Sequence, residues 1–169
     1  GLSLGGIVAM EILGQAPERV ERVALMDTNP FAEATEVKAR RAGQIARALS
    51  GDLVGVMREE MKPNYLAPGG DPGILDLCLR MALDLGPEVF RDQSVALRDR
   101  PDQQQAVACY KGPTLILMGA EDKLCPRDRH ERLLALMSHA SFTVIEGAGH
   151  LPPLEQPEAT AQAMNAWLG

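Results

Sequence analysis

The first six residues, Gly-Leu-Ser-Leu-Gly-Gly, constrain the fold of this chain more than any other stretch. They place Ser3 in a Gly-x-Ser-x-Gly pattern, and an apolar run over residues 7–13 that suits a helix follows directly. Glycine on both sides of a serine lets the backbone fold back sharply, because a Cβ would clash there. The pattern predicts a turn that exposes the Ser3 hydroxyl and points the Leu4 N–H at a developing oxyanion, near the positive end of the helix dipole. The same pattern also occurs in ordinary glycine-rich turns, so the motif alone does not identify Ser3 as a nucleophile. Evidence from the rest of the chain is needed.

The composition excludes several classes of function. The chain of 169 residues carries a net charge of −6, 4% aromatic residues and no block of basic residues. We therefore expect binding neither to nucleic acid nor to a membrane surface, and no run is apolar enough to span a bilayer. The odd set of three cysteines lacks metal-type spacing, which favours a reduced, cytoplasmic protein with packed thiols. The length suits one domain.

Alternating apolar patterns predict an α/β fold with a parallel sheet. Continuous apolar runs indicate strands buried on both faces, and helical periodicity fills the segments between them. Such alternation implies right-handed parallel connections, so we expect a partial sheet of about three strands. The expected strands are residues 20–27, 113–119 and 141–146, and the helices beside them are 4–15, 127–137 and 157–168.

Residues 31–110 separate the first two expected strands and contain no strand-like run. A crossover between parallel strands needs only about a dozen residues, so most of this segment must be an inserted helical module. One of its expected helices is capped by Asp71 and ends at Gly86, where another begins. The proline- and glycine-rich stretch 64–73 is expected to be a mobile loop. The expected core is then residues 1–30 and 111–169.

Three chemically suited side chains lie at the ends of expected elements. Asp122 follows the strand 113–119, His150 follows the strand 141–146, and Ser3 lies in the predicted turn. In parallel α/β sheets, reactive groups gather at the carboxyl ends of the strands. A serine nucleophile needs a base within hydrogen-bond reach, and the base needs a third group to orient it. The chain offers these groups in the order Ser, Asp, His, which is the order of the α/β-hydrolases.

Three stretches resemble the catalytic segments of the α/β-hydrolase superfamily, particularly its esterase-like members. They are Gly-Leu-Ser-Leu-Gly-Gly at 1–6, Pro-Thr-Leu-Ile-Leu-Met-Gly-Ala-Glu-Asp-Lys-Leu-Cys-Pro at 113–126, and Gly-Ala-Gly-His-Leu-Pro-Pro-Leu-Glu-Gln-Pro-Glu at 147–158. The resemblance implies that Ser3 is the nucleophile, Asp122 the orienting acid and His150 the general base. It also implies an oxyanion-hole N–H from Leu4, a helical cap over the substrate pocket, and no metal or cofactor.

Several residue assignments stay open at this stage. Asp27 also follows an expected strand, so it could replace Asp122 as the acid or simply cap a turn. Cys125 lies three residues after Asp122 and could be close to the chemistry or be a packed thiol. His130 and His139 are expected to be solvated, on a helix face and at a helix end.

The position of Ser3 departs from the family, in which the elbow serine lies in the middle of the chain. The strand that leads into the turn and the loop that gives a second oxyanion donor are expected before Gly1. The strand 20–27 would then have an open apolar edge, which is a template for pairing. We expect either the C-terminal portion of a larger hydrolase or a truncated form that associates with itself, for instance as a dimer.

The sequence thus predicts a carboxylesterase-like serine hydrolase that acts on small esters, lactones or similar acyl compounds through an acyl-enzyme. Asn29, Leu124 and Leu151 are expected in the walls of the substrate pocket. The alternative is a catalytically impaired or inactive remnant of hydrolase ancestry that self-associates or binds a small ligand.

Overall fold

The chain forms two compact units, and the computed structural model describes all 169 residues, Gly1–Gly169. The first unit comprises residues 1–31, 65–70 and 102–169, and the second comprises residues 32–64 and 71–101. The expected boundaries of the helical insert, residues 31–110, differ from those of the second unit at three places, because Phe31 and residues 65–70 and 102–110 belong to the first unit. In the first unit, residues 65–67 hydrogen-bond to the loop around His150, and Val107 and Tyr110 join the core beneath the sheet.

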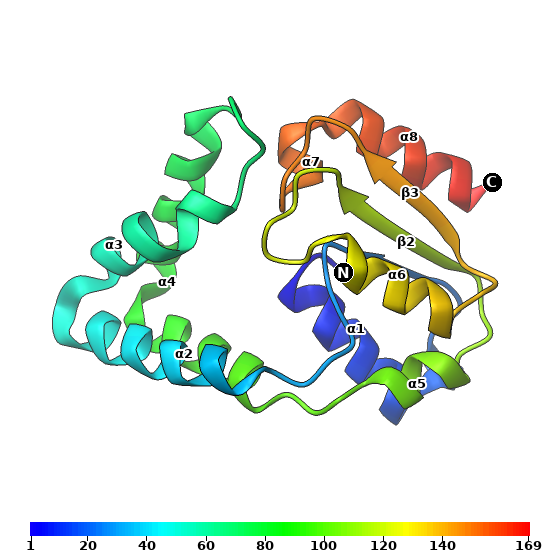
Figure 1. Cartoon of the computed structure of the whole chain (residues 1–169), viewed down its shortest axis with the longest axis horizontal. Coiled ribbons are helices and arrows are strands. Elements are labelled where there is room, and N and C mark those ends of the chain that lie inside the picture. Colours follow the sequence, from blue (N-terminus) through cyan, green and yellow to red (C-terminus); the bar gives the residue numbers. More distant parts are fainter. The chain divides into compact units, whose positions relative to one another are not determined.

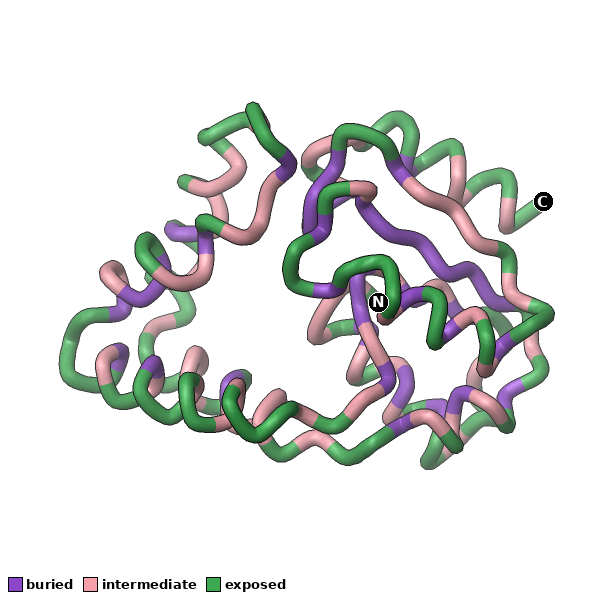
Figure 2. Tube along the Cα trace, in the orientation of Figure 1, coloured by how far each residue is buried: buried purple, intermediate pink, exposed green.

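Three parallel strands form the sheet of the first unit, in the order β1 (Val23–Met26), β2 (Thr114–Gly119) and β3 (Ser141–Ile145). Figure 1 shows β2 and β3 side by side. All residues of the central strand β2 are buried, as its continuous apolar run predicted (Figure 2). β1 is shorter than expected, since a 3₁₀ turn at Pro17–Arg19 precedes it and Asp27, with a φ of 45°, ends it. The predicted α/β class with a parallel sheet is confirmed.

Helices cover both faces of this sheet, because alternate strand residues point to opposite sides. Figure 1 shows α1 (Leu4–Gln15), α5 (Gln104–Cys109) and α6 (Arg127–Leu136) on one side, and α8 (Pro157–Leu168) after the short α7 (Pro152–Glu155) on the other. The first face buries Met10, Leu13, Val23, Leu25, Val107, Tyr110, Ile116, Leu133 and Met137. The second buries Leu115, Leu117, Ile145 and Ala148, with Ala163, Met164 and Trp167 of α8 packed on them.

The outer edge of β1 is not open, which corrects the sequence-based expectation. Residues 1–3 run parallel to β1, with a bridge between Leu2 and Met26. Gly1 N donates to Ala24 O at 2.7 Å, Met26 N donates to Gly1 O at 2.9 Å, and Ser3 N donates to Met26 O at 2.9 Å. The segment that leads into the serine turn therefore supplies the backbone partners that β1 needs on this side.

The second unit is helical, with α2 (Thr35–Arg47), α3 (Leu53–Gly55) and α4 (Pro72–Asp99). Wide π-helical turns at Ala48–Asp52 and Val56–Met61 flank α3. The Asp71 side chain caps α4 by accepting from Gly73 N at 2.8 Å, as predicted. Gly86, with φ 82° and ψ 173°, breaks α4 at the residue where the sequence placed a helix end. Across the whole chain, no helix combines the length and the apolar character that crossing a bilayer requires.

A buried ion pair joins the two ends of the second unit. The Arg100 guanidinium donates from Nη1 and Nη2 to the two carboxylate oxygens of Glu33, at 2.9 and 3.1 Å. Arg41 adds a third donor to the same carboxylate at 2.8 Å. Since two-point Arg–carboxylate contacts fix geometry as well as charge, this pair holds the entry and exit of the helical unit together.

Candidate active site

Ser3 sits in a strained turn immediately before α1. Its φ of 51° and ψ of −115° lie in a region that non-glycine residues rarely adopt, which is typical of residues held for function. The surroundings hold the turn in place, since Ser3 O accepts from Gly6 N at 2.9 Å and from the Thr28 hydroxyl at 3.0 Å. Thr28 is almost fully buried. The predicted sharp turn is thus present, and it depends on a residue that the sequence analysis did not single out.

The glycines around Ser3 have unequal steric roles. A Cβ on Gly1 would lie 2.2 Å from Gly5 O, and a Cβ on Gly6 would lie 2.6 Å from Thr28 Cγ2. A Cβ on Gly5 would meet nothing within 4 Å. The expected clash on both sides of the serine is therefore wrong for Gly5. The residue that must be glycine on the helix side is Gly6, because the buried Thr28 side chain lies against it.

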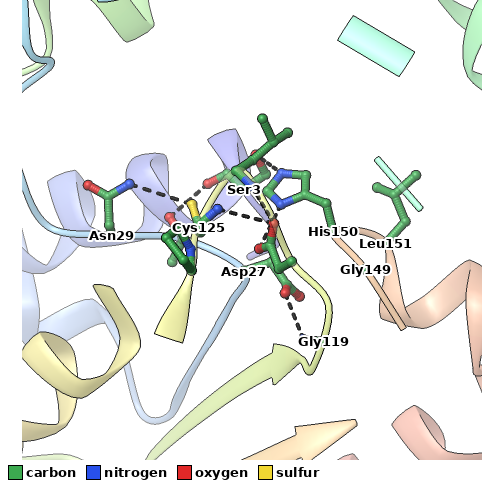
Figure 3. A network of polar contacts seen from close by, with 12 residues as sticks. Ser3, Asp27, Asn29, Gly119, Cys125, Gly149, His150 and Leu151 are labelled. Carbon is green, nitrogen blue, oxygen red and sulfur yellow. Dashed lines mark hydrogen bonds and ion pairs between the residues drawn. The ribbon is translucent and has the colours of Figure 1, made fainter. Parts of the chain in front are cut away.

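The structure brings the three predicted catalytic side chains together in one hydrogen-bonded chain. His150 Nε2 lies 2.8 Å from Ser3 Oγ, and His150 Nδ1 lies 2.9 Å from Asp122 Oδ2. Figure 3 shows the Ser3 and His150 side chains pointing toward one another. Asp122 and His150 are buried, whereas Ser3 is only partly covered. A partly accessible hydroxyl is thus joined to a buried imidazole and a buried carboxylate.

Asp122 is held as a carboxylate. Burial opposes its ionisation most strongly, but the hydrogen bond from His150 and the N–H groups of Cys125 and Leu124 together hold the pKa of Asp122 below its usual value. Because an ionised carboxylate only accepts hydrogen bonds, Nδ1 of His150 must donate to it. Nε2 of a neutral His150 ring is then free to accept the Ser3 proton.

Asp27, the alternative acid, makes no hydrogen bond to the His150 ring. Its side chain is fully buried; Oδ1 accepts from Gly119 N at 2.8 Å and Oδ2 has no partner (Figure 3). Burial raises the pKa of Asp27 to about 9, although the Gly119 N–H opposes the shift; the neighbouring charge of Asp122 adds to the rise. Asp27 is therefore a neutral acid at physiological pH, next to a charged Asp122.

The loop that carries His150 is fixed by residues to which the sequence analysis gave no role. His150 N donates to Tyr65 O at 2.7 Å, and the Tyr65 ring stacks beside the imidazole with centroids 6.3 Å apart. The Glu155 carboxylate accepts from Gly149 N and Leu151 N, at 2.9 and 3.0 Å. The available sequence signal for Glu155 was an acidic residue five positions after His150, between Pro153 and Pro157.

The three residues predicted to line the pocket have different surroundings. The Asn29 amide contacts Cys125 Sγ at 3.6 Å and accepts from Phe31 N at 3.2 Å. Leu124 is 41% exposed, and Leu151 is half-buried directly after His150. A separate cavity of about 430 Å³ contains none of these three residues and none of the triad, and is lined by Leu13, Gly14, Pro17, Asp102, Gln103, Gln105, Ala106, Cys109 and Tyr110.

Cys125 is a buried thiol, and it lies beside Asp122 and His150, two of the predicted catalytic residues. Ligand atoms of Asp122, Cys125 and His150 lie within 4.8 Å of one another and could gather around a metal ion. However, His150 Nδ1 and Asp122 Oδ2 already bond to each other, and Nε2 bonds to Ser3. A metal ion would have to break this hydrogen-bonded chain.

The two remaining histidines differ from each other. His139 is exposed, as expected, and its Nε2 lies 3.1 Å from Gly112 O. The expectation that His130 is solvated is wrong, because its side chain on α6 is fully buried. His130 Nδ1 lies 3.4 Å from Pro126 O and Nε2 has no partner, and burial lowers the pKa of this ring. α6 therefore turns His130 toward the sheet rather than toward solvent.

A parallel sheet, a strained serine turn and a Ser–His–Asp chain together define a class of hydrolase-like α/β proteins. The chain belongs to the alpha/beta hydrolase family, whose sequence model matches residues 1–163.

Known proteins similar to this chain include enzymes of ester and acyl chemistry. A dihydrolipoyllysine-residue acetyltransferase component of an acetoin cleaving system from Pseudomonas putida is 26% identical over 176 residues, which is 99% of this chain and 44% of that protein. A pimeloyl-[acyl-carrier protein] methyl ester esterase from Neisseria meningitidis is 27% identical over 170 residues, which is 95% of this chain and 65% of that protein.

Among solved structures, a thermophilic esterase from Thermogutta terrifontis matches with a TM-score of 0.93 and 30% identity, over 99% of this chain and 62% of that one. The chain thus spans less than two thirds of the length of each of these relatives.

Proposed function

We propose that this protein is a serine hydrolase of small carboxylic esters or lactones, with Ser3 as nucleophile, His150 as general base and Asp122 as orienting acid. The observation that carries the proposal is the unbroken chain of hydrogen bonds from Ser3 Oγ through the imidazole to Asp122 Oδ2, at 2.8 and 2.9 Å. These distances are within the range in which a base can take a proton from a nucleophile.

The proposed reaction has two acyl-transfer steps. Ser3 Oγ attacks the substrate carbonyl carbon while its proton passes to His150 Nε2. The tetrahedral intermediate collapses, the carbon–oxygen bond of the leaving group breaks, and the leaving alcohol takes the proton from His150. Water then attacks the acyl-enzyme with His150 again accepting a proton, and the acid is released as that proton returns to Ser3 Oγ.

The N-terminus of α1 supports charge stabilisation in this reaction. Gly5 N donates to Leu2 O and Gly6 N donates to Ser3 O, whereas the Leu4 N–H has no such acceptor. A free N–H directly after the nucleophile, at the positive end of a helix, is suited to an oxyanion. We assign Leu4 as one donor of the oxyanion hole.

The similar proteins support an ester as the substrate. The Neisseria meningitidis relative is named for hydrolysis of a methyl ester, and the Thermogutta terrifontis structure is that of an esterase. We place Asn29, Leu124 and Leu151 in the substrate-binding wall, because Leu151 follows His150 directly and Leu124 and Asn29 adjoin Asp122 and Cys125 through their hydrogen bonds.

Hydrolysis of short-chain p-nitrophenyl esters tests this function. We expect turnover by the wild-type protein and a loss of at least about 10³-fold in kcat for Ser3→Ala, since triad members act as a unit. Ser138→Ala is the matched control, because Ser138 is an exposed serine away from the triad. Equal turnover by the wild-type protein and Ser3→Ala would remove Ser3 from the mechanism.

A further inference from the structure

The Glu155 carboxylate makes an unusual set of contacts around the catalytic histidine. One oxygen, Oε2, accepts from Gly149 N at 2.9 Å and from Leu151 N at 3.0 Å, the residues on either side of His150. The other oxygen, Oε1, accepts from Ala67 N at 2.7 Å. Hydrogen bonds to a charged acceptor are stronger than neutral ones, so a single side chain holds three backbone donors.

The local sequence explains how Glu155 reaches this position. α7 is a single turn, Pro152–Glu155, in which Leu154 N and Glu155 N both donate to Leu151 O, at 2.9 and 3.0 Å. Proline at the start of this turn fixes φ and needs no acceptor for an N–H. The chain therefore folds back at once after His150 and returns the Glu155 carboxylate to the loop.

The segment Tyr65–Ala67 completes the arrangement. His150 N donates to Tyr65 O at 2.7 Å, so the three successive N–H groups of residues 149–151 all have acceptors. A Cβ on Gly149 would lie 2.6 Å from the Leu66 carbonyl carbon and 2.7 Å from Ala67 N. The two backbones are thus in direct contact, and Glu155 joins them.

We propose that Glu155 is a positioning residue that fixes the His150 ring on Ser3 by anchoring the backbone on both sides of His150 to the segment Tyr65–Ala67. This inference rests on the proposed roles of Ser3 and His150. Loss of the carboxylate leaves three N–H groups without their acceptor and frees the loop to shift. A misplacement of about 1 Å in a catalytic group can cost about 10²-fold in rate.

The kinetic test compares Glu155→Ala and Glu155→Gln with the control Glu158→Gln, a substitution of an exposed glutamate at the start of α8. Gln keeps one acceptor oxygen and so preserves contacts on one side only. We expect kcat to fall by about 10²-fold in Glu155→Ala and by less in Glu155→Gln, with KM nearly unchanged in both. An unchanged kcat in Glu155→Ala, or a rise in KM without a fall in kcat, would overturn the proposal.

An NMR measurement keeps the positioning role separate from ester hydrolysis. We expect the proton between His150 Nδ1 and Asp122 to give a downfield signal, and His150→Gln identifies that signal by its loss. We expect this signal to broaden or disappear in Glu155→Ala, to shift in Glu155→Gln, and to stay in place in Glu158→Gln. A signal that is the same in wild type and both Glu155 variants refutes the positioning role, whereas absence of ester turnover by the wild type refutes the proposed function alone.

Discussion

At the residue scale, two buried aspartates at neighbouring strand ends have opposite protonation states. Asp122 is an ionised carboxylate held by His150 and two backbone N–H groups, and Asp27 is a neutral acid held by one N–H. Pairs of titratable groups whose surroundings push their pKa values apart often reveal which group does which task. The geometry assigns the contact with His150 to Asp122.

Replacing Asp122 and Asp27 separately by asparagine tests which of the two carboxyls orients His150. We expect Asp122→Asn to lower kcat by roughly 10³–10⁴-fold, because the amide can donate to Nδ1 and stabilise the wrong histidine tautomer. Asp27→Asn should keep kcat within a few-fold of wild type, since Asn keeps an acceptor for Gly119 N. Ester hydrolysis by the two variants measures this, and a larger loss in Asp27→Asn than in Asp122→Asn would make Asp27 the orienting acid.

Asp27 also predicts a dependence of stability on pH. Its pKa is about 9 in the folded protein, whereas the ordinary value for an aspartate is 3.8, so between these values the folded chain binds the extra proton. The contribution of Asp27 is therefore fully present below pH 3.8 and is lost as pH rises towards 9.

We expect Asp27→Asn to remove this slope and to raise the free energy of unfolding near pH 8 by about 1–3 kcal/mol, because a neutral amide replaces a carboxyl that must resist ionisation. Urea unfolding at a series of pH values measures the slope. The exposed Asp99, whose pKa is lowered by Arg98, supplies the control Asp99→Asn, which should keep the wild-type slope in this window. A slope in Asp27→Asn equal to that of wild type would contradict the prediction.

The sequence was sufficient to select three side chains that the fold brings into one hydrogen-bonded chain, Ser3, Asp122 and His150, because each has a distinctive neighbour pattern and a place at the end of an expected element. It preferred Asp122 but left Asp27 open as an alternative acid, since both follow strands and only the fold decides which carboxyl reaches Nδ1. The sequence analysis predicted that His130 is exposed to solvent, again because sequence alone does not show how the element packs. Its helix is polar overall, and the direction in which α6 turns depends on packing against β2.

At the element scale, the start of α1 shows which part of a glycine pattern carries the turn. Gly5 and Gly6 are adjacent in sequence, but only Gly6 lies against the buried Thr28 side chain. Thr28 in turn donates to Ser3 O. The pattern predicted the turn correctly, while the steric reason for one of its glycines became visible only once β1 and the turn after it were placed beside α1.

Alanine substitutions of these two glycines should have opposite effects. Gly6→Ala should destabilise the protein by about 1–3 kcal/mol and lower activity, because its Cβ displaces Thr28 and with it the Ser3 turn. Gly5→Ala should be neutral or stabilise by up to about 1 kcal/mol, since alanine is the better helix former. Thermal unfolding and ester turnover of both variants provide the comparison, and equal destabilisation by the two substitutions would argue against the contact with Thr28.

The types of β2, β3, α6 and α8 followed the sequence closely, since each is long enough to show either an apolar run or a helical spacing of apolar residues. Short elements did not. α5 and α7 each span only a few residues, so no periodic pattern can develop, and both are set by contacts within the first unit. The same contacts draw residues 65–70 and 102–110 into that unit, which is why the expected domain boundaries moved.

At the scale of the whole molecule, the surface expected to mediate self-association is a different one from that predicted. The sequence analysis proposed the outer edge of β1, but residues 1–3 already pair with this edge. An apolar face of α1 remains instead, with Val8 51% and Ile12 45% exposed one helical turn apart. Apolar residues occur all around this helix, which is typical of helices that are covered on every side.

We expect this chain on its own to self-associate through the Val8–Ile12 face of α1. Each of the two side chains is about half exposed, so burying its remaining surface is worth roughly 1 kcal/mol, and a dimer through this face would bury both side chains of both copies. Light scattering coupled to size-exclusion chromatography should show a mass above that of one chain, rising with concentration.

The double substitution Val8→Lys with Ile12→Lys should give a monomer, because a charge at the centre of an apolar contact cannot be buried unpaired. Leu168→Lys, at an equally exposed leucine at the end of α8, is the control and should leave the mass unchanged. A wild-type chain that stays monomeric at every concentration, or equal effects of the α1 and α8 substitutions, would show that this face does not drive association.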